Sequence, residues 1–239
     1  MRPRPAFVAA SILTADFGNL HRVVQKLERA GVDRIHLDVM DGHFVPNLTF
    51  GPDVVHAIRG LTRLPLDVHL MISEPARYVP RFIEAGSDSV TFHVEIDEPV
   101  DAQRSTLQDI RAAGLAAGLA ISPRTPSSAV EPFLDILDIV MVMTVEPGWG
   151  GQRFIVDCAA KIGEARRIFD ARPAGGQVHV DGGINRDTAS IVGAEGIDVL
   201  VVGSALFQRR LDTAVEVETV RRRAEAARGG DASPDGATA

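Results

Sequence analysis

The feature that most constrains the fold of this chain is the alternation of short apolar segments with amphipathic segments, repeated eight times. Short runs rich in Val, Ile and Leu predict buried strands, and apolar residues spaced three or four apart predict helices. The predicted strands are residues 7–11, 33–40, 66–72, 87–94, 115–121, 139–145, 177–181 and 197–203. Predicted helices span 17–30, 52–58, 101–113, 127–134, 157–169, 186–194 and 211–227, and one more begins at Pro75.

Strands separated by helices pair in parallel and connect by right-handed crossovers, so eight such units predict an α/β fold, the (β/α)8 TIM barrel. The alternative is a doubly wound open sheet, which rarely has eight evenly spaced units and would leave edge strands. The absence of a composition shift before Gly229 predicts a single domain over residues 1–228. The small polar stretch "GGDASPDGATA", residues 229–239, predicts a disordered tail.

Composition narrows the class of protein. Of the 239 residues, 45% are hydrophobic, enough for a large core, yet no apolar stretch approaches the roughly 20 residues of a membrane span. The N-terminus carries no apolar segment typical of a secretory signal, and a single cysteine, Cys158, fits a reducing cytoplasm. A net charge of −7 argues against a nucleic-acid-binding protein.

Strand periodicity predicts which side chains enter the barrel. In "RIHLDVM", Ile35, Leu37 and Val39 would face the helices, so the other residues point into the lumen. The inward set on the second strand is His36, Asp38 and Met40, and the same alternation selects Ser11, His69, Met71, Met141, Met143, His179 and Asp181 on other strands. Most of these residues lie near the C-terminal ends of their strands, where barrel enzymes build their active sites.

Two imidazoles, His36 and His69, and two carboxylates, Asp38 and Asp181, would therefore converge at one mouth. Such a set could bind a divalent transition metal such as zinc, iron or manganese. The alternative is four hydrogen-bonded core residues, but burying unpaired carboxylates is costly unless a metal or a catalytic task requires them. Of the remaining histidines, His179 is assigned a structural role, and His93 could line the pocket without being a ligand. The others, His21, His43 and His56, are assigned surface or packing roles.

Glycine-rich loops follow three consecutive predicted strands, at residues 147–151, 181–183 and 203–204. Glycine lets backbone N–H groups approach an anion closely, and barrels often bind phosphate after strands seven and eight. Each loop alone could be a tight turn. Together at one mouth they predict a phosphate cradle, which would let an acidic protein hold an anionic substrate through amides and a metal.

The chain resembles the ribulose-phosphate 3-epimerase family from about Phe7 to Phe207. The resemblance is carried by "SILTADF", "HLDVMDGHFVPNLTFGP", "VHLMISEP", "TFHVE", "MTVEPGWGGQ", "VDGGI" and "VVGSALF". Two mild departures are Ala10, where the family commonly has proline, and Trp149, where it usually has phenylalanine. Neither departure falls on a residue of the predicted metal cluster.

The resemblance implies a site and a set of partners. His36, Asp38, His69 and Asp181 would bind one divalent ion per chain, with Zn²⁺ as the first expectation and Fe²⁺, Mn²⁺ or Co²⁺ as alternatives. Asp38 would accept a proton and Asp181 would donate one, while Ser11 and His69 contact the sugar. Residues at the phosphate end would be Gly148, Trp149, Gly150, Gly151, Gly182, Gly183, Gly203 and Ser204. A homo-oligomer acting on a phosphorylated ketose is expected.

The implied reaction interconverts D-ribulose 5-phosphate and D-xylulose 5-phosphate by inverting C3. Removing a proton from one face and returning one to the other requires two acids, while the metal ion stabilises the enediolate. Met40, Met71 and Met143 would exclude water. The alternatives are an epimerase of another ketose phosphate, such as allulose 6-phosphate, and a catalytically silent phosphosugar-binding barrel. Related decarboxylases and aldolases use an Asp-x-Lys pair, but Asp38-Val39-Met40 contains no lysine.

Overall fold

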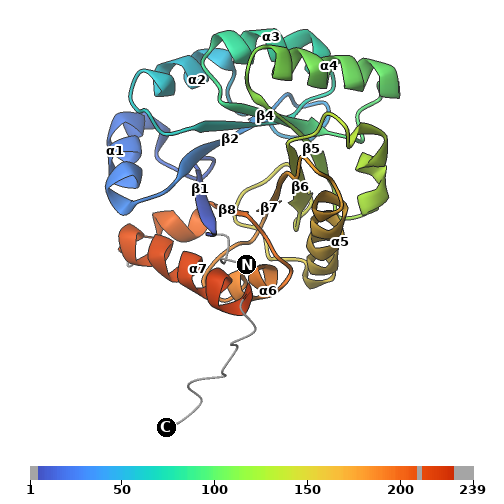
Figure 1. The fold of residues 1–239 in the computed structure, drawn as a ribbon. Helices are drawn as coiled ribbons and strands as arrows, with labels where there is room; N and C mark the ends of the chain where they lie inside the picture. Colours follow the sequence, from blue (N-terminus) through green and yellow to red (C-terminus); the bar gives the residue numbers. More distant parts are fainter. Residues whose placement is uncertain (1–4, 209–211, 229–239) are drawn as a thin grey trace.

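The computed structural model describes residues 5–208 and 212–228, which form a closed barrel of eight parallel strands in sequence order (Figure 1). Strand β1 pairs with both β2 and β8, which closes the ring. The strands are β1 (Phe7–Ser11), β2 (Arg34–Met40), β3 (Leu66–Met71), β4 (Ser89–His93), β5 (Ala116–Ile121), β6 (Ile139–Met143), β7 (Gln177–Asp181) and β8 (Val199–Val202). The predicted (β/α)8 barrel is confirmed.

Helices surround the barrel, as Figure 1 shows. They are α1 (Leu20–Ala30), α2 (Pro52–Arg59), α3 (Pro75–Glu84), α4 (Val100–Ala112), α5 (Ala159–Asp170), α6 (Ala189–Ala194) and α7 (Thr213–Arg228). Four 3₁₀ segments complete the described part of the chain: η1 (Phe17–Asn19), η2 (Ser127–Phe133), η3 (Val156–Cys158) and η4 (Ser204–Phe207). No helix among the described residues is long and apolar enough to cross a bilayer.

Two predicted helices were wrong in part. Residues 127–134 form only the 3₁₀ segment η2, because Pro132 lacks the N–H that an α-helix interior requires. The helix predicted from residue 186 begins at Ala189, because the Asn185 side chain accepts hydrogen bonds from the backbone N–H groups of Asp187 and Thr188 in a turn. Residue 211, the predicted start of the last helix, and the predicted tail 229–239 lie outside the described residues.

Alternate residues of each strand face different cores, as the periodicity predicts. Ile35, Leu37 and Val39 are buried in the large cluster that packs strands against helices. Met40 and Met71 belong to a separate cluster at the mouth. Separate apolar clusters also hold the inward residues of β6 and of β1 and β8, namely Met141, Met143, Phe7, Ala9, Val199 and Val201. The inward alternation is therefore confirmed on these strands.

A repeated contact holds the N-terminal end of the barrel. An aspartate directly precedes each even-numbered strand, and its carboxylate accepts a hydrogen bond from a backbone N–H near the start of the strand before it. The contacts are Asp33 to Val8 at 2.7 Å, Asp88 to Leu66 at 2.8 Å, Asp138 to Ala117 at 3.1 Å and Asp198 to Val178 at 2.8 Å. Each aspartate also pairs with an arginine, respectively Arg221, Arg59, Arg111 and Arg166. This end is held by structural ion pairs, which leaves the opposite end for the site.

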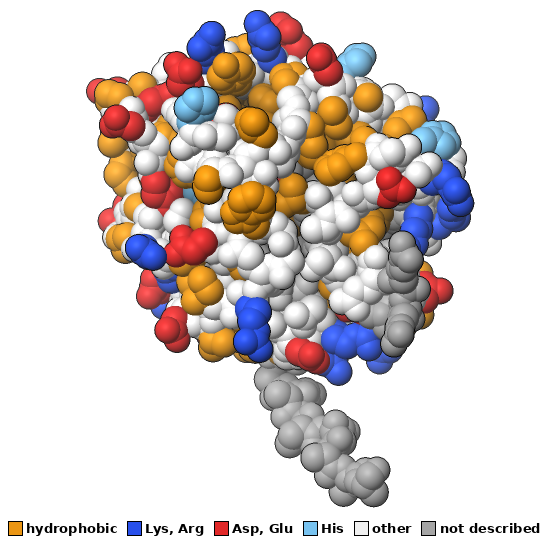
Figure 2. Space-filling view, turned by 180° about the vertical axis from the view of Figure 1, so that it is seen from behind, with side chains coloured by type: hydrophobic (Ala, Val, Ile, Leu, Met, Phe, Trp, Pro, Cys, Tyr) orange, Lys and Arg blue, Asp and Glu red, His pale blue; other side chains and the backbone are white. Residues whose placement is uncertain are grey.

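The surface carries charges of both signs. Figure 2 shows one face of the molecule, on which charged side chains lie mostly toward the edge, while apolar side chains and uncharged surface occupy the middle. Among the described residues, the large exposed hydrophobic side chains are Phe17, Leu48, Val100, Trp149, Val156, Ile191 and Val215. Trp149 and Leu48 lie on loops that follow β6 and β2, at the C-terminal ends of these strands.

Candidate functional site

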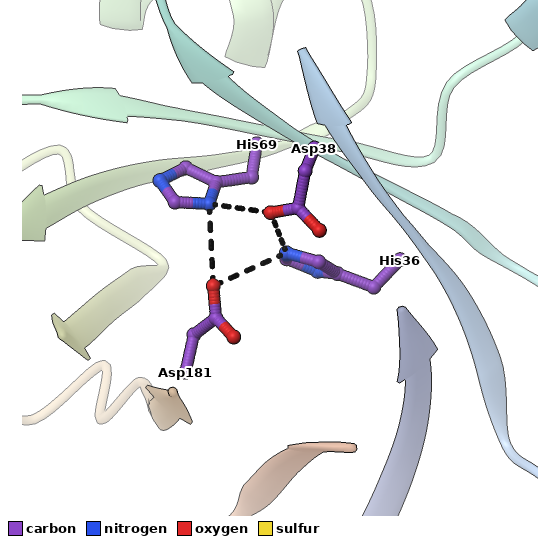
Figure 3. A group of neighbouring side chains, drawn as sticks. All are labelled: His36, Asp38, His69 and Asp181. Atoms are coloured by element: carbon purple, nitrogen blue, oxygen red, sulfur yellow. Dashed lines mark hydrogen bonds and ion pairs between the residues drawn. The ribbon is translucent and has the colours of Figure 1, made fainter. Parts of the chain in front are cut away.

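Four side chains meet inside the barrel near the C-terminal ends of the strands (Figure 3). His36 and Asp38 come from β2, His69 from β3 and Asp181 from the end of β7. His36 Nε2 lies 3.3 Å from Asp38 Oδ1 and 3.9 Å from Asp181 Oδ2, and His69 Nδ1 lies 3.3 Å and 3.6 Å from the same two oxygens. One ligand atom from each residue lies within 4.8 Å of all the others.

This arrangement fits a metal ion. His36 is fully buried, its Nδ1 lies 2.9 Å from Asp67, and its Nε2 has no hydrogen-bond partner. A buried polar atom without a partner is costly, and this nitrogen faces the oxygens of Asp38 and Asp181. Two imidazole nitrogens and two carboxylate oxygens are a donor set that suits zinc and other divalent transition metals. The predicted residues therefore come together as a possible metal-binding cluster.

The electrostatics of the cluster favour positive charge. Burial opposes charging of His36, but the carboxylates of Asp38 and Asp67 outweigh it and raise the pKa of His36 well above its usual value. The pKa of His69 is also raised despite burial, through its contacts with Asp181 and Asp38. Burial would raise the pKa of Asp38, but His36 and His69 hold it far below its usual range. A cation bound here would take the place of protons on the imidazoles.

Further contacts orient these side chains. Ser11 Oγ donates a hydrogen bond of 2.6 Å to Asp38 Oδ2, which leaves Asp38 Oδ1 facing the imidazoles. Asp67 on β3 accepts from His36 Nδ1 at 2.9 Å and from Ser89 Oγ at 2.5 Å. Sequence reasoning missed Asp67, although it has the same inward alternation as His69 on its strand. That alternation was the available signal.

A cavity opens beside the cluster and is lined by Asp38 and Asp181. Its lining also includes twelve of the thirteen residues predicted to bind substrate, namely Ser11, Met40, Met71, Met143, Gly148, Trp149, Gly150, Gly151, Gly182, Gly183, Gly203 and Ser204. The remaining one, His69, is fully buried and lies outside this lining, as does His36. Leu13, Thr14 and Gln152 also line the cavity and were not predicted.

Glycine lets the loops after β6 and β7 pack closely against each other beside the cavity. Gly183 has φ of +67°, and a Cβ there would lie 2.5 Å from the backbone nitrogen of Phe154. Gly182 has φ of +120°, and a Cβ there would lie 2.5 Å from a Val145 methyl group. Neither Lys nor Arg lines this cavity in the described part of the chain. An anion entering it would therefore meet backbone amides and the cluster.

The loops at the mouth are tied to one another. Asp41, at the end of β2, accepts hydrogen bonds from the backbone N–H groups of His43, Phe44 and Ser73, which joins the loops after β2 and β3. Asn47 Nδ2 donates to the carbonyl oxygen of Gly148 at 2.8 Å, which joins the loop after β2 to the loop after β6. The cavity wall is thus assembled from several connected loops.

Comparison with solved structures gives the fold. A 3-keto-L-gulonate-6-phosphate decarboxylase from Vibrio cholerae matches with a TM-score of 0.69 at 14% identity, covering 92% of this chain and 98% of the other. A 3-hexulose-6-phosphate synthase from Salmonella typhimurium matches with a TM-score of 0.66 at 18% identity, covering 91% and 98%. At these identities the likeness concerns the barrel alone.

Sequence comparison gives the family. The model of the "Ribulose-phosphate 3 epimerase family" matches residues 7–207. A ribulose-phosphate 3-epimerase of Bacillus subtilis is 47% identical over 201 residues, covering 84% of this chain and 91% of the relative. One from Rhodobacter capsulatus is 48% identical, covering 84% and 86%. The chain therefore belongs to the ribulose-phosphate 3-epimerase family.

Proposed function

We propose that this protein interconverts D-ribulose 5-phosphate and D-xylulose 5-phosphate by inverting C3. The observation that carries the proposal is the placement of two carboxylates, Asp38 on β2 and Asp181 on β7, which point toward one another at one cavity (Figure 3). The choice of substrate is supported by family membership and by relatives that are named for this activity and match 84% of the chain.

Two acids are needed because inversion removes the C3 proton from one face and returns one to the other. Asp38 takes the proton and Asp181 delivers one, and their roles exchange when the reaction runs backward. Asp38 is ionised, because His36 and His69 hold its pKa far below its usual range, so its carboxylate carries no proton of its own. The hydrogen bond from Ser11 holds its carboxylate plane in place.

His36, Asp38, His69 and Asp181 would hold one divalent metal ion, with Zn²⁺ as the first candidate and Fe²⁺, Mn²⁺ or Co²⁺ as alternatives. When bound, such an ion supplies a Lewis acid that stabilises negative charge on substrate oxygens. Met40, Met71 and Met143 line the cavity with apolar thioethers, which exclude water without offering a competing proton.

The phosphate end of the substrate would rest on the glycine loops, through backbone N–H groups of residues 148–151, 182–183 and 203–204. We further propose that the protein works in the cytoplasm as a homo-oligomer. One cysteine, Cys158, buried and free, is in keeping with a reducing compartment. Exposed Leu48, Trp149 and Val156, which are 73%, 56% and 62% exposed, are candidates for burial between subunits.

Turnover in D₂O tests the two-acid mechanism. Wild type given D-ribulose 5-phosphate should form xylulose 5-phosphate that carries deuterium at C3, because one carboxylate loses the abstracted proton to solvent and the other delivers deuterium. Asp38→Asn and Asp181→Asn should each lower the turnover rate by a factor of at least about 10²–10⁴, which is what a positioned acid or base contributes. Metal content must be measured in each variant, because both residues also belong to the cluster.

Three outcomes would contradict the proposal, in whole or in part. Product free of deuterium at C3 would exclude proton abstraction there. In a panel that includes allulose 6-phosphate, faster turnover of that sugar would reassign the substrate while keeping the mechanism. If the metal-loaded protein turned over no ketose phosphate, the remaining alternative would be a catalytically silent phosphosugar-binding barrel.

A further inference from the structure

A second histidine outside the cluster contacts one of its members. His69 uses Nδ1 to face Asp38 and Asp181, and its other ring nitrogen, Nε2, lies 3.0 Å from Nε2 of His93 on β4. His93 Nδ1 lies 2.9 Å from Oε2 of Glu95, and both imidazoles are fully buried. We call Glu95, His93 and His69 the histidine relay. Neither His93 nor Glu95 belongs to the cluster or lines the cavity.

Counting protons fixes the direction of these hydrogen bonds. A neutral imidazole carries one N–H, and a metal ligand nitrogen must offer its lone pair. If His69 Nδ1 is the ligand, the proton is on Nε2 and is donated to His93 Nε2. His93 must then carry its own proton on Nδ1, which faces the Glu95 carboxylate. Each contact in the relay has one donor and one acceptor only in this arrangement.

Glu95 sets that direction from the far end. Burial alone would raise the pKa of Glu95, but hydrogen bonds from His93, from Thr125 and from the backbone of Ser122 lower it to about 2, so Glu95 is a carboxylate that can only accept. Its Oε1 accepts from Ser122 N at 2.7 Å, which fixes the side chain. In the opposite arrangement a lone pair of His93 Nδ1 would face the carboxylate in a buried setting, which is unfavourable.

The other ligand imidazole is held more simply. His36 Nδ1 donates directly to Asp67, which leaves His36 Nε2 free for the cluster. Both imidazoles thus have a carboxylate behind them, one in direct contact and one through His93. We propose that Glu95 and His93 are positioning residues that hold His69 in the tautomer with a free lone pair on Nδ1. This inference rests on the proposed metal site.

The first test measures zinc affinity by chelator competition in the wild type and three variants. Glu95→Leu removes the acceptor and should weaken Zn²⁺ binding by about 10–100-fold, the usual effect of losing a residue that orients a ligand. Glu95→Gln should recover most of the loss, because its amide oxygen still accepts from His93. Glu74→Leu, a matched change at an exposed glutamate that pairs with Arg77, should leave affinity unchanged.

The second test needs no variant. Nitrogen-15 NMR of the zinc-bound wild type should show the proton of His93 on Nδ1 and that of His69 on Nε2. A proton on His93 Nε2, or equal zinc affinity in the wild type and Glu95→Leu, would overturn the inference. A wild type that binds no zinc would instead contradict the proposed metal site and the inference with it. Affinity and tautomer are both measured without turnover, so the outcomes remain distinct.

Discussion

At the residue scale, function depends on side chains whose orientation is set by their neighbours. Asp38 illustrates this: Ser11 holds one carboxylate oxygen, and the other faces two imidazoles. His36 is likewise held between Asp67 and the cluster, so its ring has little freedom. Side chains preorganised in this way lose little freedom when they bind a metal or substrate. Single substitutions should therefore separate the roles of these residues.

The metal content of the purified protein tests the cluster. Wild type should contain about one divalent ion per chain, and His36→Ala and His69→Ala should each lose most of it, because each removes one of four ligand atoms. His21→Ala is a suitable control, since this exposed histidine on α1 contacts only Gln25 among the contacts described. Elemental analysis measures the result. Equal metal content in the wild type and both cluster variants would contradict the site.

Asp41 predicts a pH dependence. Burial would raise its pKa, but hydrogen bonds from Ser73, His43 and Phe44 lower it below its usual value. A lowered carboxylate pKa stabilises the fold above the ordinary pKa, and this contribution is lost as pH falls through the folded-state pKa. Asp41→Asn should lower the free energy of unfolding by about 1 kcal/mol at pH 7.

The difference between wild type and Asp41→Asn should shrink below pH of about 4, as the wild-type carboxyl becomes protonated. Urea unfolding at a series of pH values measures it. A difference that stays constant or grows toward low pH would show that the ionised carboxylate does not hold these loops.

At the element scale, the aspartate–arginine pairs join neighbouring βα units at the N-terminal end of the barrel. In three pairs, the arginine lies on the helix that precedes an odd-numbered strand, and the aspartate precedes the next strand. In the fourth pair, Arg221 lies on α7, which follows β8, and Asp33 precedes β2. Their environments differ, since the side chains of Arg166 and Asp198 are 10% and 9% exposed and those of Arg59 and Asp88 are 26% and 51% exposed. Burial should therefore decide how much each pair contributes.

Replacing the buried aspartate should cost more than replacing the exposed one. Asp198→Asn removes the buried charge partner of Arg166 and leaves it only the more exposed Asp170, so it should destabilise the fold by about 3 kcal/mol. Asp88→Asn should cost about 1 kcal/mol or less, because water screens the exposed pair. Chemical denaturation of both variants measures the difference. Equal losses would mean that the shared hydrogen bond to the strand N–H, rather than the ion pair, dominates.

At the scale of the whole molecule, the site lies at one end of a barrel whose chain continues past α7. The predicted tail, residues 229–239, follows Arg228 and lies outside the described residues. α7 packs against α6 and α1 and lies next to strand β1, so the barrel is closed before the tail begins. Cavity-lining residues likewise end at Ser204. Catalysis should therefore not require the tail.

Deleting residues 229–239 should leave turnover and the subunit count unchanged, because the cavity and the cluster are complete without them. Steady-state kinetics and light scattering measure both quantities. A control truncation within α7, ending at residue 219, removes the buried Val220 and Ala224 and should destabilise the fold. A large loss of activity or of assembly after the shorter deletion would assign the tail a role.

The sequence alone determined the barrel and the position of its cluster. Side chains along a strand alternate between its two faces, and in a barrel one face is the lumen. Once eight strand–helix units were recognised, the apolar residues on the outer face left His36, Asp38, His69 and Asp181 to point inward at the strand ends. The glycine loops were visible for the same reason, since strand order places them at one mouth. Short-range patterns carry this information because they do not depend on which distant residue is a neighbour.

Only the tertiary structure decided the contacts that orient the cluster. Asp67 behind His36, and Glu95 behind His93 and His69, depend on how neighbouring strands align, and pattern alone does not specify their hydrogen bonds. The pair of Arg221 and Asp33 joins residues 188 positions apart, which meet only because the barrel closes. Such contacts follow from three-dimensional closure and side-chain packing, so no local period in the sequence reveals them.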